Sequence, residues 1–176
     1  METVLIAAVD GTGSEPEALR QALEVFGFFV ATKYVARPND LIDILEDKIP
    51  FPWDYLIISC HGENGAIIMP LLGESIYKPD EPRGNFSAAE IERCCKLFGK
   101  TILSLGCTTG QETIASVFAK GNQYIAPTDY VAGNSALYFA VRFFYEIAQN
   151  GCTVHDAWQL AANTDKETGY FAYYSK

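Results

Sequence analysis

The feature that most constrains the fold of this chain is a series of short, continuous apolar runs, each ending in polar or turn-forming residues. The first run spans residues 4–9 and stops at the cluster Asp10-Gly11-Thr12-Gly13-Ser14. A continuous run of this kind is typical of a strand buried on both faces of a parallel sheet. Runs of the same type, which predict further strands, cover residues 28–35, 54–59, 101–105 and 124–126.

Segments with helical spacing separate these runs. Ser14 has the character of an N-cap, and Gly27 is placed to close the helix that follows it. Ser87 and Glu90 have the spacing of a capping box. Further helices are expected near residues 38–45, 111–119, 135–149 and 153–163. Repeated strand–helix units predict an α/β fold, a three-layer α/β/α sandwich around a mostly parallel central sheet. A chain of 176 residues suits one domain, so we expect residues 1–176 to form a single α/β domain.

Two segments do not follow the strand–helix pattern. Residues 66–69 and 75–77 are short and apolar, and we expect them to pair as a hairpin. Residues 78–85 form a polar, proline-containing stretch that indicates a surface loop. The aromatic tail, residues 170–174, is either a last strand or a docking segment, and the sequence leaves both open.

The charge balance restricts the partners. Thirteen Lys and Arg against twenty-two Asp and Glu leave a net charge of −9, which argues against nucleic acid and against an anionic membrane surface. No apolar stretch is long enough to span a bilayer, and the N-terminus lacks a basic leader, so we expect a cytoplasmic protein. The cysteines are odd in number and without a C-x-x-C pair, which favours free thiols and predicts neither a metal site nor a cofactor; they are Cys60, Cys94, Cys95, Cys107 and Cys152.

Two candidate catalytic side chains follow two different predicted strands. His61 and Gly62 come after one strand, and Gly106 and Cys107 after another. Because parallel strands present their carboxyl ends at one edge, His61 and Cys107 meet there if their strands are neighbours. A thiol nucleophile needs a nearby base, and the N–H groups of Gly62 and Cys107 are placed to form an oxyanion hole. Each residue also has a structural interpretation, a buried thiol or a hydrogen-bonded ring.

The same segments resemble a known superfamily. Leu56-Ile57-Ile58-Ser59-Cys60-His61-Gly62 looks like the His-Gly strand of the caspase-like cysteine peptidases (clan CD), and residues 102–110 look like their catalytic Cys strand. The similarity is greatest to the CHAT and gingipain-like branch, which the segment Gly151–Ala157 also resembles. The resemblance implies a caspase-like fold and a thiol endopeptidase, with His61 as general acid and base, Cys107 as nucleophile, and the Gly62 N–H in the oxyanion hole.

The resemblance also points to a specificity residue. In that superfamily the pocket that selects the residue before the scissile bond includes the end of the first strand, which here is near Asp10. A carboxylate there implies cleavage after Lys or Arg. A turn residue that caps the next helix is an equal alternative for Asp10, and Asp129 and Asp156 are weaker candidates for the same pocket.

Other functions remain open at this stage. The chain lacks the Gln-Ala-Cys-x-Gly signature of caspases, so a catalytically silent caspase-like adaptor is one alternative. A flavodoxin-like module that binds a small ligand at residues 10–14 is the other. For the enzyme, the expected partner is a protein or peptide substrate. The sequence leaves open whether the chain acts as a monomer, as a homodimer or within a larger assembly.

Overall fold

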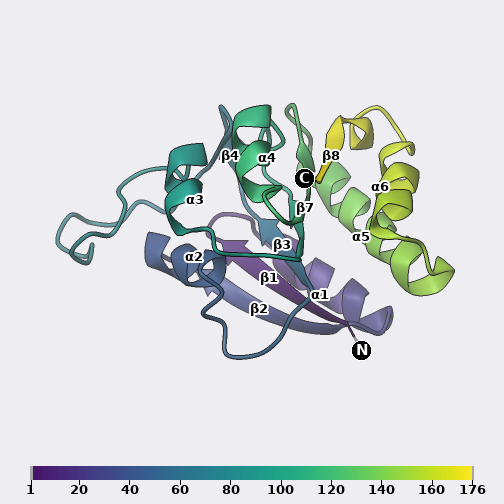
Figure 1. Ribbon diagram of the computed structural model, residues 1–176, viewed down its shortest axis with the longest axis horizontal. Coiled ribbons are helices and arrows are strands. Elements are labelled where there is room, and N and C mark those ends of the chain that lie inside the picture. Colours follow the sequence, from purple (N-terminus) through teal and green to yellow (C-terminus); the bar gives the residue numbers. More distant parts are fainter. Residues whose placement is uncertain (1, 176) are drawn as a thin grey trace.

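A six-stranded, mostly parallel sheet forms the centre of the molecule (Figure 1). The structure, a computed structural model, describes residues 2–175. All neighbouring strands are parallel except the last pair. In spatial order the strands are β2 (Phe29–Val35), β1 (Thr3–Val9), β3 (Tyr55–Ser59), β6 (Thr101–Ser104), β7 (Gln123–Pro127) and β8 (Phe171–Ser175).

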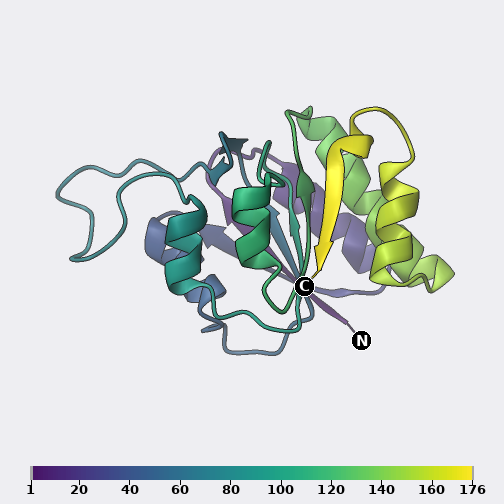
Figure 2. The ribbon, with the colours of Figure 1, turned by 45° about the horizontal axis from the view of Figure 1, so that its top comes forward.

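Helices cover both faces of this sheet, so the expected three-layer α/β/α sandwich is confirmed (Figures 1 and 2). One face packs against α1 (Glu15–Val25), α5 (Gly133–Asn150) and α6 (Val154–Ala162). The other face packs against α2 (Pro38–Leu45), α3 (Ala88–Cys94) and α4 (Glu112–Phe118). None of the helices within residues 2–175 has the length and hydropathy that crossing a bilayer requires.

The two-sided burial explains why the strand sequences are continuously apolar. In β3, Ile57 belongs to the cluster under α1 and α5, whereas Leu56 and Ile58 belong to the cluster under α2, α3 and α4. All three are fully buried. Because successive side chains point to opposite faces, a polar residue at any of these positions would be buried without a partner.

The aromatic tail is the last strand of the sheet. After a short 3-10 turn, η1 (Thr168–Tyr170), β8 runs antiparallel to β7, with Ile125 opposite Tyr173. The Tyr174 hydroxyl reaches back to donate a hydrogen bond to the Gly110 carbonyl at 2.5 Å. Of the two alternatives for the tail, the structure shows the last strand.

The expected hairpin between residues 66–69 and 75–77 is wrong. Instead β5 (Ala66–Ile67) pairs with β4 (Gly62–Glu63), the segment just before it. The connection is Asn64-Gly65, with φ angles of 52° and 69°. Two consecutive positive φ angles are what a two-residue hairpin turn requires, and Asn-Gly is its preferred sequence. The local turn preference therefore outweighs the apolar character of residues 75–77.

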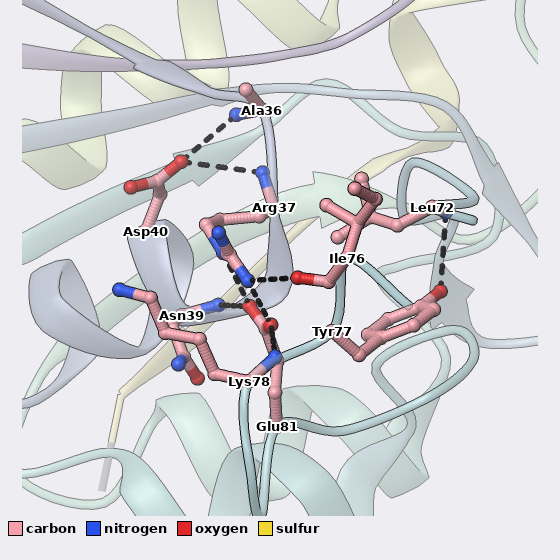
Figure 3. Close-up of polar contacts among 9 residues, drawn as sticks. All are labelled: Ala36, Arg37, Asn39, Asp40, Leu72, Ile76, Tyr77, Lys78 and Glu81. Carbon is pink, nitrogen blue, oxygen red and sulfur yellow. Dashed lines mark hydrogen bonds and ion pairs between the residues drawn. The ribbon is translucent and has the colours of Figure 1, made fainter. Parts of the chain in front are cut away.

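A buried ion pair attaches the long loop between β5 and α3 to the body of the protein (Figure 3). The Glu81 side chain has no solvent exposure and accepts hydrogen bonds from Arg37 Nε at 2.9 Å and Nη2 at 2.5 Å. Its carboxylate also accepts the backbone N–H groups of Asn39 and Lys78. Arg37 Nη2 donates in addition to the Ile76 carbonyl. Glu81 thus joins two turns of the loop to the start of α2.

Candidate active site

His61 and Cys107 lie at the same edge of the sheet. The register of β3 and β6 pairs Tyr55 with Thr101 and Ile58 with Ser104, an offset of 101 − 55 = 46 positions. The same offset relates His61 to Cys107, since 107 − 61 = 46. Each residue follows its strand at the carboxyl end, and alternation from Ile57 and Leu103 directs both side chains toward the α1 and α5 face.

Both side chains line one cavity of about 360 Å³. Its floor is the sheet edge, one wall is the segment from Gly11 to Glu15 at the start of α1, and the opposite wall is Val131, Gly133 and Ala136 at the start of α5. Ligand sites of open α/β sheets occur at this position, outside the carboxyl ends of the strands. The structure therefore brings together the two residues that the sequence singled out.

The ring of His61 is oriented by a backbone carbonyl. His61 Nε2 lies 3.0 Å from the Gly11 oxygen. A carbonyl oxygen only accepts hydrogen bonds, so Nε2 carries the proton and Nδ1 of the neutral ring keeps its lone pair. Gly11 has a φ of 91°, and a Cβ at Gly11 would lie 3.6 Å from the ring. The β1–α1 turn thus sets the tautomer that leaves Nδ1 available as a base.

The thiol of Cys107 is half-buried and held by the opposite wall. The Cys107 thiol donates a hydrogen bond to the Val131 carbonyl oxygen, which lies 3.4 Å from Sγ. Sγ also accepts a hydrogen bond from the Val131 N–H, whose nitrogen lies 3.5 Å away. The thiol is therefore held at the cavity by two contacts with the backbone of Val131.

The backbones of Gly62 and Cys107 are in close contact. A Cβ built on Gly62 would lie 2.2 Å from the Cys107 oxygen and 3.0 Å from its nitrogen, so only glycine fits there. Among the described residues, no carbonyl accepts the Cys107 N–H. The backbones of Gly62 and Cys107 therefore approach closely, and the Cys107 N–H is left available to a ligand.

The turn after Cys107 is strained and firmly held. Thr108 has a φ of 60°, a conformation that costs a β-branched residue roughly 1–3 kcal/mol. Its hydroxyl accepts the Gly65 N–H at 3.0 Å, and its own N–H donates to the Asp129 carbonyl. The Tyr124 hydroxyl donates to the Thr109 carbonyl at 2.8 Å. These contacts fix the chain direction immediately after the nucleophile candidate.

Cys60 precedes His61 but packs mainly into the core. It is 5% exposed and belongs to the core cluster on the α2 and α4 face, as alternation from Ile58 predicts. Burial raises the pKa of the Cys60 thiol to about 12, which makes thiolate formation unfavourable. Its Sγ contacts the Ser104 hydroxyl at 3.8 Å. Cys60 therefore has the environment of a structural thiol.

The acidic candidates do not gather at this cavity. Asp10 is exposed and lines a separate hollow with Tyr34 and Val35, beside β2. Asp129 accepts the N–H of Tyr130, and Asp156 accepts the Thr153 hydroxyl at the start of α6.

Glu15 is the acidic residue that does line the cavity. The sequence indicated only a first-turn helix residue at this position. Its one signal was its place, six residues beyond the end of a strand that leads to the ligand-binding edge.

Within residues 2–175, no three His, Cys, Asp or Glu side chains lie close enough together to hold a metal ion. No known protein-family model matches the chain, and no curated protein matches it significantly.

Proposed function

We propose that this protein is a cysteine endopeptidase of the caspase-like type, with Cys107 as nucleophile and His61 as general base and acid. The observation that carries the proposal is the shared cavity. Two neighbouring parallel strands are followed by His61-Gly62 and by Gly106-Cys107, and the side chains of His61 and Cys107 line the same concave site. Nucleophile, base and candidate oxyanion donors are then contributed by the sheet edge, which is a rigid part of the fold.

Acylation begins with transfer of the Cys107 proton to His61 Nδ1. The thiolate attacks the carbonyl carbon of the scissile peptide bond and forms a tetrahedral intermediate. The N–H groups of Gly62 and Cys107 stabilise its oxyanion, an effect that contributes about 10²–10³ in rate for one donor. The imidazolium gives its proton to the departing amine, the C–N bond breaks, and a thioester on Cys107 remains.

Deacylation uses the same residues in the reverse order. His61 Nδ1 accepts a proton from water while the hydroxide attacks the thioester carbonyl. The second tetrahedral intermediate collapses with cleavage of the C–S bond, and the proton on His61 returns to the Cys107 sulfur. One peptide bond and one water thus yield a carboxylic acid and an amine. Throughout the cycle the Gly11 carbonyl accepts from Nε2 and stabilises the imidazolium.

The electrostatics of the cavity argue against the flavodoxin-like alternative. A phosphate at residues 10–14 would be favoured by positive charge. The wall there carries the Glu15 carboxylate, which would repel a phosphate, and neither Lys nor Arg lines the cavity among the described residues. A catalytically silent adaptor remains the competing proposal, because it needs the same fold without a reactive Cys107.

Covalent labelling tests the proposal directly. The protein is treated with peptidyl acyloxymethyl ketones that end in Arg, Lys, Asp or Leu, and intact mass spectrometry counts the adducts. Cys107→Ala and His61→Ala are compared with the wild type, and Cys152→Ala serves as a matched control, since Cys152 is also a half-buried free thiol.

We expect one adduct on the wild type and on Cys152→Ala, and none on Cys107→Ala. His61→Ala should be labelled at least about 100-fold more slowly. Absence of an adduct, or adducts on several cysteines at a rate independent of His61, would reject the peptidase and favour the silent adaptor.

A further inference from the structure

The cavity beside Cys107 has one acidic wall and one apolar wall. Glu15 stands on the α1 side, whereas Leu105 from the sheet edge and Val131 and Ala136 from the α5 side supply aliphatic surface. No Lys or Arg lines it within the described residues. A side chain with an apolar stem and a cationic head would match both walls.

The Glu15 carboxylate is held in place but only half satisfied. Its Oε1 accepts a hydrogen bond from the Ser59 hydroxyl at 2.6 Å. Ser59 is completely buried on β3, two residues before His61, so this contact ties the carboxylate to the same strand that carries the base. Oε2 accepts no hydrogen bond from any residue between 2 and 175.

The charge of Glu15 is likewise uncompensated. The residue is half-buried, and no Lys or Arg forms an ion pair with it in the part of the chain that the structure describes. Burial raises the pKa of the Glu15 carboxyl, and the Ser59 hydrogen bond and His61 only partly oppose that rise. A desolvated carboxylate without a cation is costly, and a cationic ligand would offset the cost through a charge-assisted hydrogen bond.

We propose that Glu15 is the specificity-determining residue of this site and that its carboxylate receives the Arg or Lys side chain preceding the scissile bond. This inference rests on the proposed peptidase function and extends it to the substrate class. It moves the selecting carboxylate from Asp10, which lines a different hollow, to the first residue of α1. The aliphatic stem of the substrate residue packs on Leu105, Val131 and Ala136.

The test compares matched probes that differ only in charge. Peptidyl acyloxymethyl ketones ending in Arg or in citrulline, its neutral isostere, are reacted with wild type, Glu15→Gln, Glu15→Ala and Asp10→Asn. Glu17→Gln is the control, because Glu17 lies on the same helix, is exposed and does not line the cavity. The measured quantity is the ratio of the Arg rate to the citrulline rate, and each melting temperature confirms folding.

We expect wild type and Glu17→Gln to prefer Arg by at least about tenfold, a difference of roughly 1.4 kcal/mol. Glu15→Gln, which can still accept the Ser59 hydrogen bond, and Glu15→Ala should both bring the ratio close to one.

Three results overturn the inference. A preference for Arg that survives in both Glu15 variants leaves the peptidase standing but rejects Glu15 as the selector. A preference lost in Asp10→Asn and kept in the Glu15 variants assigns the role to Asp10. Failure of both probes to label Cys107 in the wild type, together with failure of the four-probe set above, rejects the proposed function and this inference with it.

Discussion

Replacing Gly62 with alanine should damage both the stability and the reactivity of this protein, because the new methyl group meets backbone. The added Cβ would lie 2.2 Å from the Cys107 oxygen, whereas contacts below 3.0 Å are essentially never observed for a Cβ. The two chain segments must therefore separate by at least 3.0 − 2.2 = 0.8 Å. The Thr109 methyl, 2.9 Å from the same Cβ, obstructs a sideways movement.

The expected magnitudes follow from that displacement. Overpacking in a buried site destabilises a protein by about 1–3 kcal/mol. Alanine also lowers the conformational entropy of the unfolded chain relative to glycine, which offsets roughly 0.4–1 kcal/mol of that loss. A net loss near 1 kcal/mol lowers the melting temperature by about 2–4 °C in a chain of this size. A shift of about 1 Å between catalytic groups costs on the order of 100-fold in rate.

Thermal unfolding and the labelling rate of Cys107 measure the two effects. Gly169→Ala is the matched control, since Gly169 is exposed and its Cβ would be in ordinary contact, 3.6 Å from the Ala162 oxygen. We expect Gly169→Ala to match the wild type in labelling and to melt at the same or a slightly higher temperature. If Gly62→Ala melts no lower than the wild type and labels Cys107 within about threefold of its rate, the backbone-contact argument is refuted.

Three further predictions concern other parts of the structure. Arg37→Met leaves the Glu81 carboxylate without its cation and should lower the urea midpoint of unfolding at pH 7. Arg37, with smaller contributions from the backbone N–H groups of Lys78 and Asn39, lowers the pKa of Glu81 from 4.5 to about 2. The advantage of the wild type over Arg37→Met should therefore be complete above pH 4.5 and shrink as the pH falls toward 2, and an advantage independent of pH would contradict this. Iodoacetamide at pH 8 should leave Cys60 unmodified, because burial raises the pKa of its thiol to about 12. If peptide mapping finds Cys60 among the first thiols alkylated, its placement in the core is wrong. Tyr174→Phe removes the hydroxyl that donates to the Gly110 carbonyl and should cost about 1 kcal/mol while the ring stays packed; an unchanged unfolding midpoint would show that this contact does not stabilise the turn.

Much of the fold was predictable because two-sided burial leaves a strong pattern. The central positions of a strand such as β3 must be apolar, so the strand can be located from residues 54–59 alone. The capping box at Ser87 and Glu90 is also a local signal, and α3 begins at Ala88, directly after Ser87. Where the prediction failed, at residues 66–77, the stronger local signal was the Asn-Gly turn at Asn64 and Gly65.

The tail and the acidic residues were different, because their roles depend on distant neighbours. Nothing within residues 170–174 states that β7 has a free edge to accept them. In the same way, Asp10 and Glu15 both follow the first strand, and only the direction of each side chain separates them. Asp10 lies beside β2, whereas Glu15 reaches across the sheet edge to Ser59 on β3.

The sequence by itself determined the layer architecture and the placement of His61 and Cys107 after apolar strands, because these depend on periodicity along the chain. The tertiary structure alone decided that their strands are neighbours with an offset that aligns the two residues. It also decided the tautomer of His61, through the Gly11 carbonyl, and the presence of Glu15 in the cavity. The physical reason is that strand order and the approach of one loop to another are set by long-range packing. A one-dimensional pattern of apolar and polar residues does not encode such packing.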